Sequence, residues 1–509
     1  MMSTSMSPAA GFSTPRGLSL AQLSEQLGAF DPSLRGSAAT PVTGVQQDSR
    51  KVQPGDLFVA REGASADGTH FVAEAVGRGA SAVLVEADAG EPSLEVPLLR
   101  VRNVRRAASF AAEAVYGFPS RALRVVGITG TNGKTTVSFL VEHALQQLGA
   151  RPARLGTLGF AFEGVELDSP LTTPEADAIA RSMASVRDLG GTHFVMEVSS
   201  IALELERVSA VHFAVAALTN LTQDHLDFHG SMERYAAAKS RLFRELAPEV
   251  SVLDIDRALG RELSLAVTPV ISVGRDGSAA LHVAAARLDA AGVHAELRHA
   301  GLSLSFQSRL VGAHNLENLV LAAGVLLGLG YAPGEALAAL AQAPAVPGRL
   351  ERCDEEGDDV LVVVDYAHTP DALERVLAAL RPLTRNELCC VFGCGGDRDP
   401  QKRPKMAEAV ARGADFAFVT NDNPRSEDPA KIAEAILPPL RASGTPHVVE
   451  LDRALAIERA VLQAKPGDAV LLAGKGHETY QIFGVERVPF DDRTHARAAL
   501  RRRRARSGG

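Results

Sequence analysis

The stretch Val126-Gly-Ile-Thr-Gly-Thr-Asn-Gly-Lys-Thr-Thr136 is a glycine-rich turn that decides the fold. It begins in a strand-like run, Arg124 to Ile128, and leads into a helical pattern, because apolar residues from Val137 to Leu148 recur at spacings of three and four. Such a turn directs backbone N–H groups and the positive end of a helix toward an anion. Lys134 is placed to reach phosphates and Thr135 to bind Mg²⁺. The stretch predicts a nucleotide triphosphate site in an α/β fold.

The turn departs from the strict P-loop pattern at one position. That pattern has a glycine five residues before Gly133, where this chain has Ile128. Gly130 can make the turn instead, and core packing does not explain the Gly-Lys-Thr-Thr ending. A glycine turn that binds nothing is the alternative. The predicted ATP loop consists of Gly130, Thr131, Asn132, Gly133, Lys134, Thr135 and Thr136.

The whole chain has the composition of an ordinary globular protein. Its 509 residues are 46% hydrophobic and 22% charged, and at this length three domains are more typical than one. The formal net charge of −8 provides no chain-wide basic field for nucleic acid or an anionic membrane. No stretch approaches the roughly 20 apolar residues of a membrane-spanning helix. We therefore expect small-molecule substrates, with neither nucleic acid nor membrane as a partner.

Cysteine usage and the two ends of the chain indicate an intracellular protein. The cysteines are Cys353, Cys389, Cys390 and Cys394. They are too few and too clustered for a disulfide framework, so we expect reduced thiols.

The start, Met1 to Gly17, lacks the basic and apolar regions of a signal peptide, and we expect it to fray. We expect the basic run Arg501 to Arg506 to be a solvated or disordered end rather than a nucleic-acid arm. Together these features predict a cytoplasmic protein, which we take to be a monomer.

Strand-like runs alternate with helical patterns along the chain, which predicts α/β architecture with mostly parallel sheets. Clusters of Gly, Pro and Ser place the domain boundaries, giving domains 1–121, 122–346 and 347–509. The predicted strands outside the central domain are Asp56 to Ala60, Ser81 to Glu86, Val360 to Val364, Leu388 to Phe392, Phe416 to Val419 and Ala469 to Ala473. Polar clusters follow the last four, and ligands of such sheets lie beyond the carboxyl ends of the strands.

Six further motifs follow the ATP loop in order. They are Met196-Glu-Val-Ser-Ser200, Asn220-Leu-Thr-Gln-Asp-His-Leu-Asp227, Asp365-Tyr-Ala-His-Thr-Pro370, Gly393-Cys-Gly-Gly-Asp-Arg398, Asp422-Asn-Pro-Arg425 and Gly474-Lys-Gly-His-Glu478. This series resembles the Mur ligase family, which shares its fold with folylpolyglutamate synthase, and the order matches the members that add diaminopimelate. The resemblance implies an N-terminal α/β domain that binds the uridine nucleotide, a central P-loop ATPase-like domain with a parallel sheet, and a C-terminal Rossmann-like domain that binds the amino acid.

The resemblance also implies a magnesium site. Its catalytic and metal residues are Lys134, Thr135, Glu197, His225 and Lys239. Glu197 ends an apolar strand, and a buried carboxylate needs a cation or hydrogen-bond partners. Lys239 matches a carbamylated lysine of the family, N6-carboxylysine, whose anionic oxygen binds Mg²⁺ where an ammonium repels it. From the residues alone, His225 would be a loop histidine and Lys239 a surface helix residue.

Further contacts to ATP and to the nucleotide-linked peptide are implied in the same way. The ATP set adds Asn315, Asn318, Arg349, Asp365 and His368. Arg349 is expected to reach ATP when the third domain closes; as an alternative it is an ordinary surface arginine. The UDP-muramoyl-peptide set is Ser49, Thr172, Thr173, Ser199 and Arg207. Hydroxyls and an arginine suit a ligand with diphosphate and carboxylates. Ile201 and Leu205 replace the family's usual His and Gln in this pocket.

The predicted diaminopimelate site consists of Arg398, Asp422, Asn423, Pro424, Arg425, Gly474 and Glu478. Diaminopimelate has one carboxylate more than lysine, and that charge must be paired when it is buried. Arg425 offers a planar fork for it, with Asn423 alongside. Glu478 can take the ammonium and Arg398 the other carboxylate. The alternative is that Arg425 merely pairs with a nearby acid in the loop, Glu427 or Asp428.

The implied reaction is ATP-driven amide formation through an acyl phosphate. Within ligases, lysine or ornithine addition and folate polyglutamylation stay open. From another class, a non-catalytic nucleotide sensor or a switch GTPase is the rival. Glu197, His225 and Lys239 together argue against a sensor, which needs one metal ion rather than two. The sequence also lacks the Asn-Lys-x-Asp segment by which a GTPase reads guanine.

Overall fold

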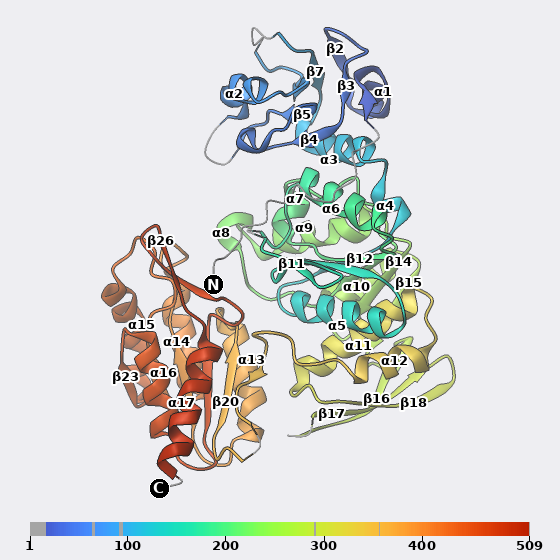
Figure 1. Cartoon of the computed structure of the whole chain (residues 1–509). Coiled ribbons are helices and arrows are strands. Elements are labelled where there is room, and N and C mark those ends of the chain that lie inside the picture. Colours follow the sequence, from blue (N-terminus) through green and yellow to red (C-terminus); the bar gives the residue numbers. More distant parts are fainter. Residues whose placement is uncertain are drawn as a thin grey trace.

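The computed structural model describes residues 17–63, 67–90, 95–169, 171–289, 292–355 and 357–507. These residues form three α/β units in chain order, each built around its own sheet (Figure 1). The predicted α/β fold class is therefore confirmed. The expected fraying of the first residues, up to position 16, lies outside the described ranges.

The first unit is a five-stranded sheet with the order β2-β7-β6-β5-β4 and helices on both faces. Its elements are β1 (Leu18–Ser19), α1 (Leu20–Gln26), η1 (Gly28–Phe30), β2 (Ser33–Arg35), β3 (Pro41–Val42), β4 (Gly44–Gln46), η2 (Ser49–Lys51), β5 (Asp56–Val59), η3 (Gly68–Phe71), α2 (Val72–Gly77), β6 (Ala82–Glu86), β7 (Leu98–Val101) and α3 (Val104–Val115). Successive strand residues point to opposite faces. Leu57 therefore packs on the α1 and α3 side and Phe58 on the α2 side.

The second unit carries an eleven-stranded sheet with the order β11-β10-β9-β12-β8-β13-β14-β15-β16-β17-β18. Its elements are α4 (Pro119–Ala122), β8 (Arg124–Thr129), α5 (Lys134–Gln147), β9 (Pro152–Gly156), β10 (Gly159–Phe162), β11 (Val165–Leu167), α6 (Ala176–Asp188), β12 (His193–Glu197), α7 (Ser200–Glu204), β13 (Val215–Leu218), α8 (Leu226–His229), α9 (Met232–Arg244), β14 (Val250–Asp254), α10 (Ala258–Ala266), β15 (Val270–Gly274), β16 (Leu281–Asp289), β17 (Gly292–His299), β18 (Leu302–Ser308), α11 (Ala313–Gly328) and α12 (Pro333–Ala341). The neighbouring strands from β9 to β16 are parallel, and antiparallel strands extend both edges.

Helices cover both faces of this central sheet. Val126 and Ile128 of β8 pack in one apolar cluster with α5, α11 and α12, whereas Val125 packs in another with α6, α9 and α10. A strand that is buried on both sides reads as a continuous apolar run, as β8 does. The carboxyl end of β8, where the glycine turn starts, is thus fixed by packing on both faces.

The third unit has a six-stranded sheet with the order β19-β20-β24-β21-β22-β23 and a separate hairpin, β25–β26. Its elements are β19 (Glu351–Arg352), β20 (Leu361–Asp365), α13 (Pro370–Leu380), η4 (Arg381–Leu383), β21 (Leu388–Phe392), α14 (Lys402–Gly413), β22 (Phe416–Val419), α15 (Pro429–Ser443), β23 (His447–Val449), α16 (Arg453–Gln463), β24 (Ala469–Ala473), β25 (Tyr480–Phe483), β26 (Glu486–Pro489) and α17 (Asp492–Ser507). The four apolar runs predicted here as strands are β20, β21, β22 and β24. They lie together in the middle of the sheet and run parallel.

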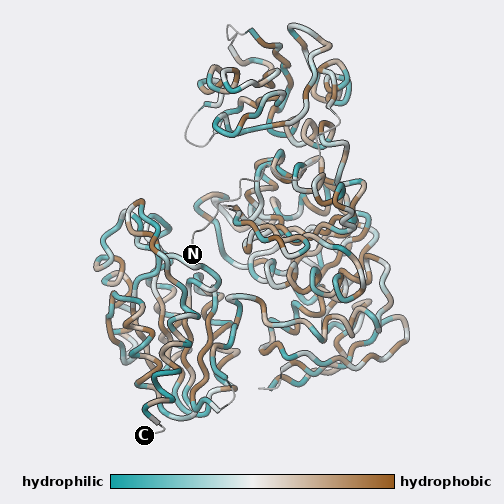
Figure 2. Tube along the Cα trace, in the orientation of Figure 1, coloured by the Kyte–Doolittle hydropathy of each residue, from teal (hydrophilic) through white to brown (hydrophobic). Residues whose placement is uncertain are grey.

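The distribution of hydropathy follows these layers. Figure 2 shows apolar segments along the strands inside each unit and polar segments toward the outside. Within the described ranges, no helix is both long enough and apolar enough to cross a membrane.

The domain boundaries at 121 and 346 stay predictions. The first falls inside α4 and the second in the loop before β19. Across the first junction, Ala180 and Ala184 of α6 join the apolar cluster of the first unit. The first and second units therefore share buried apolar surface.

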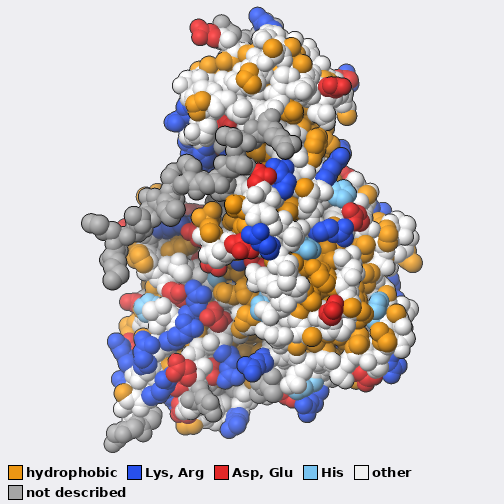
Figure 3. Space-filling model, turned by 45° about the vertical axis from the view of Figure 1, so that its right-hand side comes forward, with side chains coloured by type: hydrophobic (Ala, Val, Ile, Leu, Met, Phe, Trp, Pro, Cys, Tyr) orange, Lys and Arg blue, Asp and Glu red, His pale blue; other side chains and the backbone are white. Residues whose placement is uncertain are grey.

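The basic run Arg501 to Arg506 is not a disordered end. It forms the last turns of α17, where Arg503 Nε lies 2.6 Å from Asp359 Oδ1 and Arg504 Nε lies 2.6 Å from Asp358 Oδ1. Of the two predicted alternatives, a solvated end holds, since all of these residues except the partly buried Arg503 are exposed. A disordered end is wrong, because acidic residues that precede β20 in sequence lie beside the helix and pair with its charges. Figure 3 shows Lys and Arg side chains interspersed with acidic ones over the lower part of the molecule.

A buried ion pair joins α16 to α17 and gives a test of this packing. Arg453 and Asp492 have side chains that are 0% exposed, with Nη2 and Oδ2 2.6 Å apart. Removing one partner leaves an uncompensated buried charge, so Arg453→Met is expected to lower the free energy of unfolding by about 3–5 kcal/mol. Arg502→Met removes an exposed pair with Glu458 and is expected to cost less than about 1 kcal/mol. Urea unfolding followed by circular dichroism measures both, and equal small losses would contradict the expectation.

Candidate active site

The glycine turn after β8 has the backbone geometry that its sequence predicts. Gly130 and Gly133 have φ values of 143° and 87°, which side chains rarely adopt. A Cβ on Gly133 would lie 2.5 Å from Asn318 Oδ1, and one on Gly130 would overlap the hydroxyl of Thr219. Both glycines are thus required by conformation and by the close approach of α11 and the loop after β13.

Two lysines converge on this turn. Lys134 Nζ donates to the carbonyl oxygens of Gly130 at 2.9 Å and Thr131 at 2.8 Å, and Lys239 Nζ donates to the same Gly130 oxygen at 2.8 Å. Lys239 is 1% exposed, so the interpretation of it as a surface residue is wrong. Burial lowers the pKa of Lys239 well below its usual value, and the charge of Lys134 adds to the effect. Burial also lowers the pKa of Lys134, while Glu197 and Asp224 oppose that shift.

Glu197 and His225 lie within electrostatic reach of the two lysines. Glu197 is fully buried at the end of β12, and its carboxylate accepts hydrogen bonds from the backbone N–H of Thr157 at 2.8 Å and from its hydroxyl at 3.0 Å. Burial lowers the pKa of His225; Asp224 opposes this, and the charges of Lys134 and Lys239 add to the lowering. The structure therefore brings together the four side chains predicted as catalytic.

Asp224, beside His225, was not among the predicted site residues. Its Oδ2 lies 3.5 Å from His225 Nε2, and its Oδ1 accepts from Lys402 Nζ of the third unit at 2.8 Å. Burial alone would raise the pKa of Asp224, but the charges of His225 and Lys402 outweigh it and hold the pKa at about 2. Its carboxylate is thus ionised and joins the second and third units.

The donor set for Mg²⁺ depends on the state of Lys239. In the part of the chain that the structure describes, no three His, Cys, Asp or Glu side chains lie close enough together to hold a metal ion. Thr135 and Glu197 supply the hard oxygens that Mg²⁺ prefers, whereas the Lys239 ammonium repels a cation. The residues fit Mg²⁺ when Lys239 is a carbamate, as the resemblance implies.

The third unit contacts the glycine turn directly. Arg349 Nη2 donates to Thr135 Oγ1 at 3.3 Å, so Arg349 is at the site and is not an ordinary surface arginine. Asp371 Oδ2 accepts from Asn132 Nδ2 at 2.8 Å and from Thr222 Oγ1 at 3.2 Å. Asp371 was missed, although it directly follows the motif that ends at Pro370.

The remaining predicted ATP residues lie around the turn and mainly organise backbone. Asn318 lies against Gly133, and Asn315 on the same helix donates to a backbone carbonyl at 2.8 Å. Asp365 is buried and accepts from two backbone N–H groups, each at 2.7 Å. His368 Nδ1 lies 2.8 Å from a backbone carbonyl.

Four of the five residues predicted for the muramoyl peptide gather at the end of β12. Thr173 Oγ1 donates to the carbonyl of Glu197 at 2.9 Å, and Arg207 Nη1 donates to the carbonyl of Thr173 at 3.0 Å. Ser199 N donates to the same Thr173 hydroxyl at 3.0 Å, and Thr172 Oγ1 lies 3.2 Å from the Thr157 hydroxyl. Ser49 is engaged elsewhere, because its hydroxyl donates to Glu74 inside the first unit at 2.7 Å.

The two unusual residues of this pocket, Ile201 and Leu205, lie in and directly after α7, and both are partly buried. A buried histidine lies next to them, with His229 Nε2 2.9 Å from the hydroxyl of Ser200. This imidazole comes from α8 and therefore could not be recognised from the local motif.

An arginine cluster at the junction of the first and second units was also missed. Arg61 Nη2 lies 3.1 Å from Glu175 Oε2, and Arg207 Nη2 lies 2.7 Å from Glu175 Oε1. Burial lowers the pKa of Arg105, and the positive charge of Arg61 lowers it further. Two guanidinium groups thus share one carboxylate and a third lies within electrostatic reach of it, which suits an anionic ligand. These residues are far apart in sequence, so no motif indicates the cluster.

The residues predicted for diaminopimelate meet at the carboxyl ends of β21, β22 and β24. Arg425 has a φ of 50° and is held by the β25–β26 hairpin, since its N–H donates to Ile482 O at 3.0 Å and its carbonyl accepts from Gly484 N at 2.7 Å. Its Nη1 donates to Gly396 O at 2.7 Å. The alternative of a loop ion pair with Glu427 is wrong, because Glu427 pairs with Arg403 at 2.8 Å.

The other members of this set surround Arg425. Arg398 is exposed, and Gly395 lies between it and Arg425. Asn423 Nδ2 donates to Glu478 Oε2 at 2.9 Å. Asp422, Pro424 and Gly474 complete the walls. Lys475 lies inside the motif Gly474 to Glu478 but was not predicted as a site residue. It is buried among these residues.

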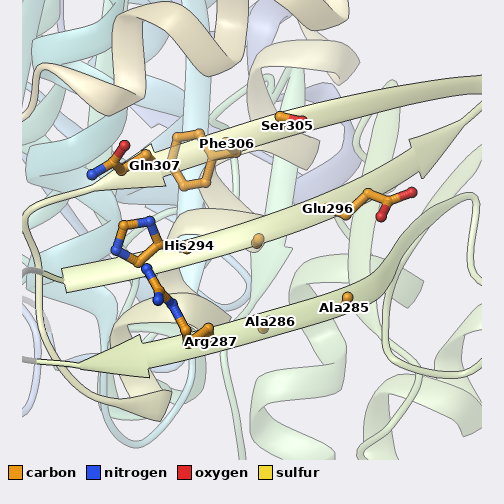
Figure 4. Close-up of a pocket in the computed structure, with 9 residues that line it drawn as sticks. Ala285, Ala286, Arg287, His294, Glu296, Ser305, Phe306 and Gln307 are labelled. Carbon is orange, nitrogen blue, oxygen red and sulfur yellow. The ribbon is translucent and has the colours of Figure 1, made fainter.

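A separate depression of about 620 Å³ lies on the β16–β17–β18 part of the central sheet. Figure 4 shows His294 and Arg287 close together there, with Glu296 further along β17 and Gln307 on β18. It contains none of the predicted site residues, and β15, β14 and β13 separate its strands from β8 in the sheet.

Comparison with known proteins assigns the family. The sequence patterns of the Mur ligase family catalytic domain, the Mur ligase middle domain and the Mur ligase glutamate ligase domain match residues 41–118, 128–326 and 348–476. A protein of Trichormus variabilis named UDP-N-acetylmuramoyl-L-alanyl-D-glutamate–2,6-diaminopimelate ligase is 44% identical over 474 residues, which are 92% of this chain and 95% of that protein. The chain belongs to the Mur ligase family.

Two further relatives have the same name. The one from Synechococcus elongatus is 45% identical over 478 residues, which are 91% of this chain and 95% of the relative. A solved structure of a UDP-N-acetylmuramoyl-L-alanyl-D-glutamate–2,6-diaminopimelate ligase superposes with a TM-score of 0.69 at 32% identity, covering 96% of this chain and 99% of that one. This Mur ligase thus matches its relatives through all three units.

Two glycine substitutions test whether the turn binds nucleotide. Gly133→Ala places a methyl group 2.5 Å from Asn318 Oδ1 in a left-handed conformation, so we expect kcat/KM for ATP to fall by about 100-fold or more. Gly149, just after α5, also has a positive φ, but no atom lies within 4 Å of the position that a Cβ would take. Gly149→Ala should therefore lower the free energy of unfolding by only about 1 kcal/mol. Steady-state ATP turnover and thermal unfolding separate the two effects. A Gly133→Ala protein with unchanged ATP kinetics would contradict the assignment.

Proposed function

We propose that this Mur ligase uses ATP to add meso-2,6-diaminopimelate to UDP-N-acetylmuramoyl-L-alanyl-D-glutamate, a step of peptidoglycan precursor synthesis. The observation that carries the proposal is the pocket at Arg425, where a guanidinium, two carboxylates and an amide lie in the same unit that contacts the ATP loop through Arg349 and Asp371. The names of the relatives, which match over about nine-tenths of this chain, support the same substrates.

The first step activates an acid. The γ-phosphoryl group of ATP passes to the γ-carboxylate of the D-glutamyl residue: a P–O bond to the carboxylate forms, the bond to the β-phosphate oxygen breaks, and ADP leaves. Lys134 and Arg349 lie at the turn where they neutralise charge on the transferred group. Mg²⁺, when bound, adds further neutralisation of that phosphoryl charge. Thr135, Glu197, His225 and carbamylated Lys239 would hold it.

The second step forms the amide. The uncharged amine of diaminopimelate attacks the acyl carbon, a C–N bond forms, and phosphate leaves with the electron pair of the C–O bond. The attacking nitrogen then loses a proton, which the departing phosphate accepts. The carboxylates of Asp422 and Glu478 are suited to hold the distal ammonium while Arg425 holds the distal carboxylate. Catalysis is then mainly a matter of positioning two substrates that are held by different units.

Carbamylation of Lys239 follows from its surroundings. An uncharged amine attacks CO₂, forming an N–C bond and releasing a proton, whereas an ammonium cannot. Burial and Lys134 hold the pKa of Lys239 well below its usual value, which raises the fraction of the uncharged amine. The carbamate would then add a negative charge near Gly130 O, which Lys134 also contacts, in place of an ammonium that repels Mg²⁺.

The amine itself decides between this function and its alternatives. Lysine and ornithine have no distal carboxylate for Arg425, and folate polyglutamylation adds glutamate. A nucleotide sensor or switch GTPase has no use for the pocket in the third unit. The cytoplasmic location and the monomeric state stay predictions.

The substrate proposal is tested by phosphate release. With ATP and UDP-N-acetylmuramoyl-L-alanyl-D-glutamate present, we expect kcat/KM for meso-diaminopimelate to exceed that for lysine or ornithine by at least about 100-fold, the discrimination typical of a buried charge left unpaired. Arg425→Gln should reduce turnover of diaminopimelate while leaving the KM for ATP nearly unchanged. Equal use of the three amines by the wild-type chain would refute the proposal.

The carbamate is tested by removing CO₂. Protein that is exhaustively exchanged into CO₂-free buffer should lose most of its ligase activity and regain it on addition of bicarbonate. At a fixed concentration of dissolved CO₂, recovery should be faster at higher pH, because the uncharged amine fraction of Lys239 rises. Lys239→Ala should be inactive under both conditions. Activity that is indifferent to CO₂ would show that Lys239 acts as an unmodified lysine.

A further inference from the structure

Lys475 is a buried cation that contacts several residues of the proposed diaminopimelate pocket. Its side chain is 0% exposed, and its Nζ donates to Glu478 Oε2 at 2.9 Å and to Asn423 Oδ1 at 3.2 Å. The same Nζ lies 3.5 Å from Asp422 Oδ1. Three of the residues assigned to the diaminopimelate pocket thus take their positions from one ammonium group, which no step of the proposed mechanism uses.

The local backbone is built to bury this lysine. Gly474 and Gly476 flank it with φ values of 110° and 52°. A Cβ on Gly476 would lie 2.6 Å from Tyr366 Cβ and 2.8 Å from Gly348 O, so the loop can pass this point only with glycine. The two glycines therefore direct Lys475 inward from the end of β24.

One acceptor in the cluster is left without a hydrogen bond. Asp422 Oδ1 is buried and faces Lys475 at ion-pair distance, yet it accepts no hydrogen bond in the described part of the chain. An orphaned buried carboxylate oxygen is costly unless a donor from outside completes it. An ammonium group of the amine substrate is such a donor.

The charges of the pocket explain why a lysine is needed. Without Lys475, Asp422 and Glu478 would place two negative charges, 12% and 16% exposed, beside the substrate. A substrate end with one ammonium and one carboxylate would then be repelled at its carboxylate. With Lys475, a single net negative charge remains for the ammonium, and Arg425 is free to bind the carboxylate.

We propose that Lys475 is a specificity-determining residue: it cancels one of the two carboxylate charges in the pocket and so favours an amine whose far end is zwitterionic over one whose far end is only cationic. This inference rests on the proposed function. Lys475 acts through Asp422, Asn423 and Glu478, so it is a positioning residue and has no role in the acyl phosphate step.

The test compares Lys475→Gln with the wild-type chain, using phosphate release with saturating ATP and UDP-N-acetylmuramoyl-L-alanyl-D-glutamate. We expect the KM for meso-diaminopimelate to rise about 100-fold, the effect of truncating one partner of a buried charged cluster. The KM values for ATP and for the nucleotide-linked peptide should change less than about twofold, because Asp422, Asn423 and Glu478, the partners of Lys475, belong to neither of those residue sets. Lys475→Arg, which keeps the charge, should recover part of the loss.

The decisive readout is the preference between amines. Loss of the positive charge penalises the distal carboxylate, so the preference for meso-diaminopimelate over L-lysine should fall about tenfold. Where turnover of L-lysine is too slow to detect, the inhibition constant of L-lysine in competition with meso-diaminopimelate is measured in place of its KM. Lys431→Gln removes an exposed charge from α15 of the same unit and should leave both values unchanged. Lys475→Met, of similar length, is used if the Gln variant does not fold.

The possible failures are distinct. A wild-type chain that rejects meso-diaminopimelate would overturn the proposed function and this inference with it. A wild-type chain that uses it, together with a Lys475→Gln protein whose amine KM is unchanged, would overturn the inference alone. An equal loss for both amines, with the preference unchanged, would likewise show that Lys475 only supports the fold of the loop.

Discussion

The structure depends on two lysine side chains that donate to one carbonyl oxygen. Lys134 and Lys239 both reach Gly130 O, although each is drawn from a different helix of the central unit. Like charges this close inside a protein are unfavourable unless anions compensate them. Glu197 is buried nearby but takes its hydrogen bonds from the neutral donors of Thr157. Burial and the charge of Lys134 therefore lower the pKa of Lys239 well below its usual value, so Lys134 is the cation at the turn that is left for the phosphates of a nucleotide.

The third unit meets this charged centre through a small number of polar contacts. Asp371 accepts from Asn132 of the turn, and Lys402 donates to Asp224. Polar contacts of this kind can form and break at little cost, whereas α6 joins the apolar cluster of the first unit. Val311, two residues before α11, packs in the apolar cluster of the third unit. The first unit is therefore attached through its core, and the third through Val311 and these polar contacts at the turn.

The sequence predicted much of this because the decisive signals are local. The glycine turn, the flanking strand β8 and the helix α5 follow from periodicity and glycine placement, and the motifs at Arg425 and Glu478 end predicted strands. The sequence did not reveal residues whose role arises from contacts across units. Asp371, Arg61 and the ordered basic helix α17 belong to this class. Lys239 was placed by resemblance alone, since its helix pattern reads as a solvent-facing one.

The two substrate sites differ in their charge balance, and this difference matches the chemistry of their ligands. The turn at Gly130 gathers Lys134 and, from the third unit, Arg349, two cations that suit a polyanion whose charge must be neutralised before a phosphoryl group can move. The pocket at Lys475 is close to neutral and already hydrogen-bonded, apart from one oxygen of Asp422. A zwitterion can enter such a pocket with little electrostatic penalty, because each of its charges meets an opposite partner while the net charge stays the same. One fold therefore provides an attractive centre for phosphates on the sheet of the second unit and a balanced site for an amine on the separate sheet of the third unit.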